Sequence, residues 1–274
     1  MCAESVCPPQ LLVTDLDGTL LPLPGCDQQI LDLQVLTDLL AQHRLSLVYA
    51  TGRHPASVMQ AMEQFRLPEP DGIFCDVGTT LLRRTSSGPF QVCPEWAQLQ
   101  KRTVAAMTGD MLRRRLRQIS GLDLQEDVKQ GDFKISFYTD ANQLADTRNL
   151  IAAELRKLRA PWSVVASIDP FNGDGLIDVL PEGISKAAAL NWWIQQHRFP
   201  TEAVIYAGDS GNDLAAIQVA YRAILVGNAL PEVRLQAREL RRQGNSGGQL
   251  FEAQAHATSG VLEGVLSFLD HTPS

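Results

Sequence analysis

The sequence has few cysteines, and their arrangement indicates neither a disulfide framework nor a zinc site. Only five occur among 274 residues, the number is odd, and no pair has the C-x-x-C spacing. A reducing, cytoplasmic location is therefore expected. The first residues, MCAESVCPPQ, lack the basic flank and the apolar stretch of a signal peptide. No apolar run approaches the roughly 18 residues of a membrane-spanning helix, so no contact with a membrane is expected.

Positive charge is also scarce. Lys and Arg total 24 against 31 Asp and Glu, which gives a net charge of −7. Proteins that bind nucleic acids are usually basic, so no nucleic-acid partner is expected. Hydrophobic residues make up 45% of the chain, which is enough for one large or two modest domains.

Apolar runs of strand length alternate with helical patterns at both ends of the chain. Strands are expected at 11–15, 45–51, 71–77, 203–209 and 223–227, and helices at 28–43, 56–65, 185–197 and 213–220. This alternation predicts an α/β fold in which helices wrap a parallel sheet. Functional sites in such sheets lie beyond the carboxyl ends of the strands.

The middle of the chain has a different pattern. A long helix is expected over 96–119, a strand over 133–139 and a second helix over 142–158. Two further strands, at 162–169 and 175–181, flank a turn-rich segment that suits a hairpin. We interpret this segment as a small α/β insert. The expected boundaries are 1–92 with 182–274 for the main domain and 93–181 for the insert.

Polar residues follow three of the expected parallel strands. In LLVTDLDGTLLP an apolar strand ends in Asp15 and Asp17, although unpaired buried charge is costly. Asp209 and Asp213 follow another strand in YAGDSGND, and Thr51 and Gly52 follow a third in VYATGR. Taken singly, each has an ordinary explanation as a turn or a helix cap. Their coincidence at the ends of strands in one sheet favours a catalytic site.

A reaction on a phosphate ester would use these residue types together. Oxygen ligands from acids bind a hard cation such as Mg²⁺, and the candidate ligands are Asp15, Asp17, Asp209 and Asp213. Asp15 is a candidate nucleophile and Asp17 a candidate proton donor and acceptor. Thr51 and Gly52 offer donors to the transferring oxygens, and Lys186, at the start of a helix, supplies positive charge. Gly18 permits a sharp turn after the acids.

The segments DLDGTLL, ATGR and GDSGND, together with Lys186, resemble the four motifs of the haloacid-dehalogenase-like (HAD) phosphatase superfamily. The resemblance implies a Rossmann-like parallel-sheet core, with Asp15 as nucleophile, Asp17 as acid and base, and Mg²⁺ as cofactor. The position of the insert resembles the type-2, C2B-like cap of the Cof-like branch. Within that branch DVGTTLL, FKISFY, LIDVLPEGISK and SGVLEGV are similar to sucrose-phosphate phosphatases.

The resemblance also implies which residues meet the substrate. These are Gly18, Thr51, Gly52, Arg53, Gly78, Thr79, Lys134, Lys186 and Asn212. Lys134 is the main candidate from the cap; its strand places it either in a polar cleft or on a solvent-exposed face. Asp169, Asn172 and Asp174 are weaker candidates, because a hairpin turn explains them equally well. For Trp192 and Trp193, packing inside a helix is favoured over stacking on a sugar.

The expected function is Mg²⁺-dependent hydrolysis of a sugar phosphate through an aspartyl-phosphate. A disaccharide phosphate such as sucrose 6-phosphate is the leading substrate. The alternatives are a broad phosphatase of monosaccharide phosphates or of a phosphorylated cofactor, and a phosphomutase. A catalytically silent domain that binds a phosphosugar or a sugar-phosphate synthase is a further alternative. We expect a monomer or a weak dimer, with such a synthase as a candidate partner.

Overall fold

The computed structural model describes residues 7–85, 88–169, 172–244 and 248–270. In these residues, eight strands form one sheet in the order β12-β11-β10-β1-β2-β3-β4-β5. The strands from β12 to β3 run parallel, and β4 and β5 are antiparallel additions at one edge. The strands are β1 Leu11–Thr14, β2 Ser46–Ala50, β3 Gly72–Cys75, β4 Thr80–Thr85, β5 Gly88–Val92, β10 Val204–Gly208, β11 Arg222–Leu225 and β12 Gln249–Glu252.

The central strands are apolar because helices cover both faces of this sheet. Every residue of β1, β3 and β10 is buried, as is typical of parallel strands that are covered on both sides. One face packs on α1 (Asp27–Gln42), α2 (Pro55–Phe65) and α9 (Ala257–Asp270), and the other on α6 (Lys186–His197), α7 (Leu214–Val219) and α8 (Pro231–Gln243). The predicted parallel-sheet α/β core is confirmed.

A second, smaller sheet is built from the middle of the chain. Among the described residues it has four antiparallel strands in the order β6-β7-β9-β8. They are β6 Asp123–Leu124, β7 Ile135–Thr139, β8 Trp162–Ile168 and β9 Gly175–Pro181. Helices α4 (Gly109–Leu116) and α5 (Leu144–Leu158) pack on one face of this sheet. The predicted hairpin is confirmed as the β8–β9 pair.

The single helix predicted over 96–119 is wrong, because the structure has two helices there. α3 (Pro94–Thr103) ends before α4 begins at Gly109. Trp96 of α3 packs into the core of the large sheet, whereas Leu112 of α4 packs into the core of the small one. The helix therefore breaks where the chain passes from one hydrophobic core to the other.

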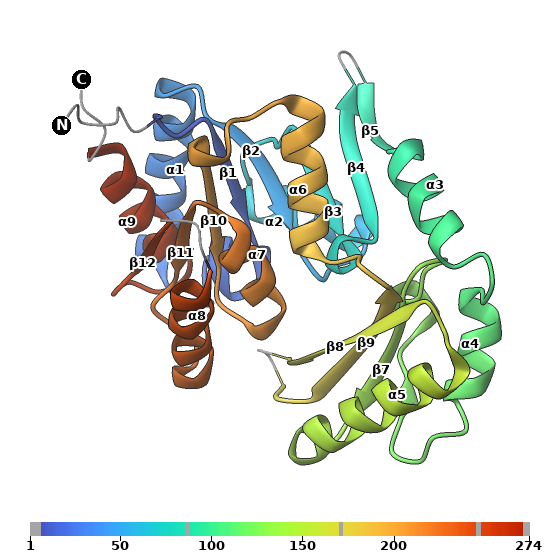
Figure 1. Cartoon of the computed structure of the whole chain (residues 1–274). Coiled ribbons are helices and arrows are strands. Elements are labelled where there is room, and N and C mark those ends of the chain that lie inside the picture. Colours follow the sequence, from blue (N-terminus) through green and yellow to red (C-terminus); the bar gives the residue numbers. More distant parts are fainter. Residues whose placement is uncertain (1–6, 86–87, 170–171, 245–247, 271–274) are drawn as a thin grey trace.

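The two sheets are separate and lie side by side. In Figure 1 the small sheet is in the green and yellow part, next to the blue and orange part that contains most of the large sheet. The hydrophobic core of the small sheet begins at Val104, and Ile184 already belongs to the large sheet. We propose the division of the chain into a core domain, 1–92 with 182–274, and a cap, 93–181. On this division α3 belongs to the cap but packs, through Trp96, into the hydrophobic core of the large sheet.

Candidate active site

Three acids meet at the carboxyl edge of the large sheet. Asp15 follows β1 and Asp209 follows β10, and these two strands pair side by side, with Thr14 opposite Ala207. Asp213 ends the one-turn helix Gly211–Asp213 that comes next. Each of the three acids offers a carboxylate oxygen within 4.8 Å of the other two. These acids were predicted from the sequence to lie together, because the carboxyl ends of neighbouring parallel strands share one edge of the sheet.

Lys186 lies among these acids. Its ammonium group donates to Asp15 Oδ1 at 2.9 Å and to Asp213 Oδ1 at 2.8 Å. The side chain is 0% exposed, because it extends from the first turn of α6 into the protein. Burial alone would lower the pKa of Lys186, but the two carboxylates outweigh it and raise this pKa. Lys186 is therefore a fixed positive charge beside Asp15.

Asp213 is the most heavily bonded of the three acids. Besides Lys186, it accepts from the Tyr206 hydroxyl at 2.6 Å and from the Asp209 amide at 3.2 Å. The amide and hydroxyl of Ser210 donate to it as well, at 3.1 and 3.2 Å. With both oxygens occupied in this way, Asp213 holds Lys186 in place. Neither Tyr206 nor Ser210 was among the predicted site residues.

The electrostatics of the cluster suit a bound cation. Burial, with the neighbouring carboxylates adding to it, raises the pKa of Asp15 well above its usual range. Burial and the charge of Asp213 raise the pKa of Asp209 to about 7. Both pKa shifts show that the nearby positive charge is too small to stabilise these two carboxylates in their charged form while they are buried. The donor atoms are all oxygens, the ligands of hard cations, so the residues fit the expected metal.

Asp17 lies outside this group. Arg53 holds its carboxylate through two hydrogen bonds, at 2.7 Å from Nε and 2.6 Å from Nη2. Ser57 in turn accepts from Arg53 at 3.1 Å. Among the described residues, the carboxylates grouped as a possible metal site are those of Asp15, Asp209 and Asp213. The Asp17 carboxylate is thus engaged by Arg53, and its role as a fourth ligand stays a prediction.

The loop after Asp15 is shaped by Gly18. Its φ is +73°, and a Cβ atom at this position would lie 2.5 Å from Asp209 Oδ2. Only glycine allows the backbone to come this close to the acid. Thr19 donates to Asp209 Oδ1 at 3.1 Å, and the side-chain amide of Asn228 donates to the Gly18 carbonyl at 2.7 Å. Thr19 and Asn228 were not among the predicted site residues.

The remaining predicted core residues lie around this cluster. Thr51 follows β2, is fully buried, and accepts from the Arg53 amide at 3.1 Å. Asn212 is half-buried in the one-turn helix beside Asp213 and accepts from the Ser210 hydroxyl at 3.3 Å. β2 pairs with β1, so Thr51 and Asp15 leave neighbouring strands at the same edge.

The turn Asp76–Gly78 adjoins the same edge after β3. Gly78 has φ +96°, and a Cβ there would lie 2.6 Å from the Ser185 carbonyl, directly before Lys186. Trp96 donates to the Gly78 carbonyl and Gln100 to that of Thr79, at 2.9 and 2.7 Å. The structure thus gives Gly78 and Thr79 roles in packing, and their contact with a substrate stays a prediction.

Lys134 faces the core domain. It is 4% exposed, so the alternative of a solvent-exposed strand face is wrong. Its ammonium lies 3.3 Å from the carbonyl of Gly52 and 3.3 Å from Asp76 Oδ1. The cap and the core therefore meet through a buried charge next to the loop of Thr51.

The comparisons with known proteins agree with this geometry. The model of the sucrose-6F-phosphate phosphohydrolase family matches residues 8–269. The chain belongs to this family. It is a sugar phosphatase of the HAD superfamily, and thus a phosphoric monoester hydrolase.

Three similar proteins show how far the likeness extends along the chain. The mannosylfructose-phosphate phosphatase of Agrobacterium fabrum is 31% identical over 94% of this chain and 96% of its own length. A glucosylglycerol-phosphate synthase of Pseudomonas anguilliseptica is 28% identical over 94% of this chain but only 30% of its own length. The sucrose-phosphatase structure from Synechocystis sp. PCC6803, with sucrose and phosphate, has a TM-score of 0.76 at 23% identity, covering 96% of this chain and 98% of that one.

Other features singled out in the sequence make structural contacts of their own. Asn172 and Asp174 are exposed and bond to each other at the tip of the hairpin, at 2.8 and 2.9 Å. Trp193 is 2% exposed and packs edge-on against Phe74, and Trp192 packs against Trp96. In the described part of the chain, no helix is long and apolar enough to cross a membrane.

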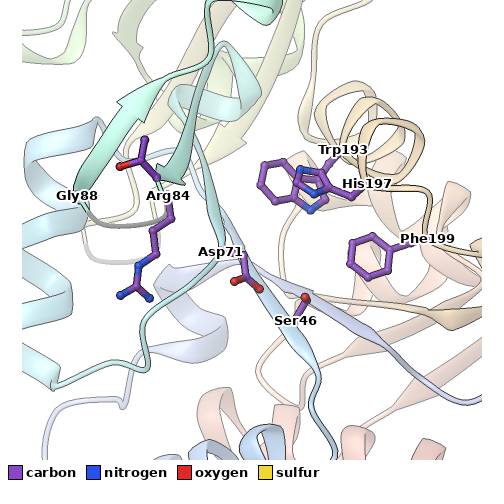
Figure 2. A pocket seen from close by; sticks show the side chains of 8 residues that line it. Ser46, Asp71, Arg84, Gly88, Trp193, His197 and Phe199 are labelled. Carbon is purple, nitrogen blue, oxygen red and sulfur yellow. The ribbon is translucent and has the colours of Figure 1, made fainter.

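A separate pocket of about 630 Å³ opens at the amino-terminal ends of the strands. Ser46, at the start of β2, and Asp71, just before β3, line it together with Arg84 and an aromatic wall of Trp193, His197 and Phe199 (Figure 2). The acids of the phosphohydrolase site follow the opposite ends of their strands. This pocket therefore has no part in the chemistry at Asp15.

Proposed function

We propose that this enzyme hydrolyses a disaccharide phosphate, such as sucrose 6-phosphate, in a Mg²⁺-dependent reaction through an aspartyl-phosphate on Asp15. The observation that carries the proposal is the buried carboxylate of Asp15, held by Lys186 at 2.9 Å beside two further acids. The names of the family model and of the mannosylfructose-phosphate phosphatase support a phosphorylated disaccharide.

Asp15 and Asp209 are the proposed principal holders of the cation, with Asp213 beside them. Asp213 is largely committed to Lys186, Tyr206 and Ser210, which favours a supporting role. When bound, Mg²⁺ would offset the charge of the acids and of the phosphate, which otherwise repel each other.

In the first step, an oxygen of Asp15 forms a bond to phosphorus, and the bond from phosphorus to the sugar oxygen breaks. Lys186 keeps the Asp15 carboxylate oriented for this attack. Thr51, Gly52 and Asn212 are proposed to surround the phosphoryl group and to donate to its oxygens as charge develops there. Water then attacks the aspartyl-phosphate, which releases phosphate and restores Asp15.

Asp17 is the proposed acid and base. It would give a proton to the leaving sugar oxygen and later take one from the attacking water. Arg53 fixes the position of Asp17 with two short hydrogen bonds. Each carboxylate oxygen keeps a second lone pair for the transferred proton, so Arg53 can hold Asp17 in position throughout the proton transfer.

The cap is proposed to recognise the sugar through the face of its sheet that carries no helices. Ile135 and Phe137 of β7 point into the cap core, so Ser136 between them points the other way. Ser136 lies opposite Asp178 of β9 and donates to it at 2.6 Å. Lys134 lies 3.9 Å from the same carboxylate. Such a group of hydroxyl, carboxylate and ammonium suits the hydroxyl groups of a sugar.

A sugar-phosphate synthase is the proposed partner, because one relative that spans this chain within a longer protein is named a synthase. We propose a monomer or a weak dimer as the free state. The free cysteines of the described part, Cys7, Cys26, Cys75 and Cys93, support the expected cytoplasmic location.

Phosphate release from a panel of esters with Mg²⁺ tests the proposal. The panel should contain sucrose 6-phosphate, mannosylfructose phosphate and glucose 6-phosphate, with p-nitrophenyl phosphate as a small ester. We expect the highest kcat/KM for a disaccharide phosphate. Equal values for the monosaccharide would instead identify a broad phosphatase, and no release from any ester would contradict the catalytic role.

A further inference from the structure

Asp76 is a buried acid at the junction of cap and core to which the proposed reaction gives no role. It is 6% exposed and follows β3, at the same sheet edge as Asp15 and Thr51. Its carboxylate lies 3.3 Å from the Lys134 ammonium, and Thr80 donates a side-chain hydrogen bond to it. The ion pair joins residues 58 positions apart, one in the turn after β3 and the other directly before β7.

The backbone around Asp76 is unusual. Asp76, Val77 and Gly78 are consecutive residues with positive φ, at 53°, 59° and 96°. A β-branched valine rarely adopts this conformation, and such strain persists only where the surroundings impose it. Here the Asp76 amide donates to the Arg53 carbonyl at 2.9 Å and the Val77 amide to the Thr51 carbonyl at 3.0 Å.

The turn Asp76–Gly78 thus touches both parts of the phosphate-binding machinery. One side is clamped to the loop of Thr51 and Arg53, and the other, at Gly78, lies against Ser185, the residue before Lys186. Lys134 reaches this turn from the cap and also bonds to the Gly52 carbonyl at 3.3 Å. Burial raises the pKa of Asp76 more than Lys134 lowers it, so the pair is kept despite the cost of its burial.

We propose that Asp76 is a positioning residue, which through Lys134 fixes the sugar-facing strand of the cap against the loop that holds the phosphate. This inference rests on the proposed hydrolysis of a sugar phosphate. Without Asp76, the ammonium of Lys134 would be held in the core domain by a carbonyl alone. Substrate binding would then have to supply the free energy that aligns the cap with the core. KM should therefore rise for substrates that touch the cap.

Asp76→Asn is a suitable variant because it has the same shape and asparagine tolerates positive φ well. The backbone clamps to Thr51 and Arg53 do not depend on the side chain and should survive. We expect KM for the preferred sugar phosphate to rise about tenfold or more, while kcat changes less than threefold. The loss for p-nitrophenyl phosphate, which leaves the sugar site empty, should be at least tenfold smaller.

A double-mutant cycle tests whether Asp76 acts through Lys134. In the background of Lys134→Met, the change Asp76→Asn should alter KM by less than twofold. Asp38→Asn on α1 and Lys101→Met on α3 are matched controls, because both side chains are exposed and the charge changes are the same. Independent effects that multiply in the double variant would overturn the proposal.

Hydrogen exchange provides a readout that requires neither turnover nor the Lys134 variant. In Asp76→Asn without substrate, amides of β7 and of residues 76–78 should exchange faster, whereas those of β1 should not. If the wild type cleaves p-nitrophenyl phosphate but no sugar phosphate, the proposed function fails, while this comparison still decides the role of Asp76. Unchanged exchange would exclude a tie between cap and core.

Discussion

Gly18 is the position at which the backbone and the acid cluster constrain each other most tightly, and Gly18→Ala is therefore an informative variant. Two separate costs are expected. The left-handed backbone, at φ +73°, costs a residue with a Cβ roughly 1–2 kcal/mol of stability. The new methyl group would also lie 2.5 Å from Asp209 Oδ2, so the carboxylate must move by about 1 Å to reach ordinary contact.

Gly25→Ala separates these costs. Gly25 has φ +78°, but a Cβ there meets no atom within 4 Å. Gly25→Ala should lose only the stability that the left-handed backbone costs, and Gly18→Ala should lose more in thermal unfolding. Only Gly18→Ala should lose activity, by about 100-fold, because a misplacement of 1 Å at a reacting centre has roughly this effect. Its requirement for Mg²⁺ should also rise, since Asp209 is a proposed ligand.

The assay is steady-state hydrolysis of p-nitrophenyl phosphate across a Mg²⁺ titration, with melting temperatures measured on the same samples. Equal activity losses in the two glycine variants would refute the collision with Asp209. A Gly18→Ala protein that keeps wild-type kcat and wild-type Mg²⁺ dependence would show that Asp209 can move without consequence, and the assignment of the metal site would fail.

Three other outcomes follow from the site and its surroundings. Asp15→Asn should fold normally but retain less than about 1% of the activity, and substantial turnover would rule out the aspartyl-phosphate. EDTA should abolish activity, and excess Mg²⁺ should restore it and raise the melting temperature. Burial is the main cause that lowers the pKa of His197. The unfolded chain therefore binds a proton at His197 more readily than the folded protein, and stability should fall as the pH drops below about 6.5. His197→Gln should remove that part of the pH dependence in unfolding curves, with no effect on turnover.

The local sequence was most informative where chemistry and secondary structure coincide. An apolar run that ends in acids identifies a buried strand and its functional end together, which is why Asp15 and Asp209 were found. It was least informative for elements whose residues are neither strongly periodic nor fully buried. β5 is mostly exposed and β12 is a short edge strand, and neither was predicted.

The contacts of individual side chains could not be predicted in the same way. The hydroxyl of Tyr206 bonds to Asp213 only because one turn of helix brings the acid back over the end of β10. In the sequence, Tyr206 is simply another large residue of an apolar strand. Arg53 bonds to the carboxylate of Asp17, which lies 36 positions earlier in the sequence. No local sequence pattern indicates such a pairing.

The sequence by itself determined the parallel-sheet core, the acids at its carboxyl edge and the separate α/β segment in the middle of the chain, because strand ends and apolar periodicity are local properties. Only the tertiary structure decided that Lys186 bonds to Asp15 and Asp213, whereas Arg53 bonds to Asp17. It also decided that Lys134 faces the core, where Asp76 meets it. These outcomes depend on how close distant segments come, since the energy of a buried charge is set by its neighbours in space.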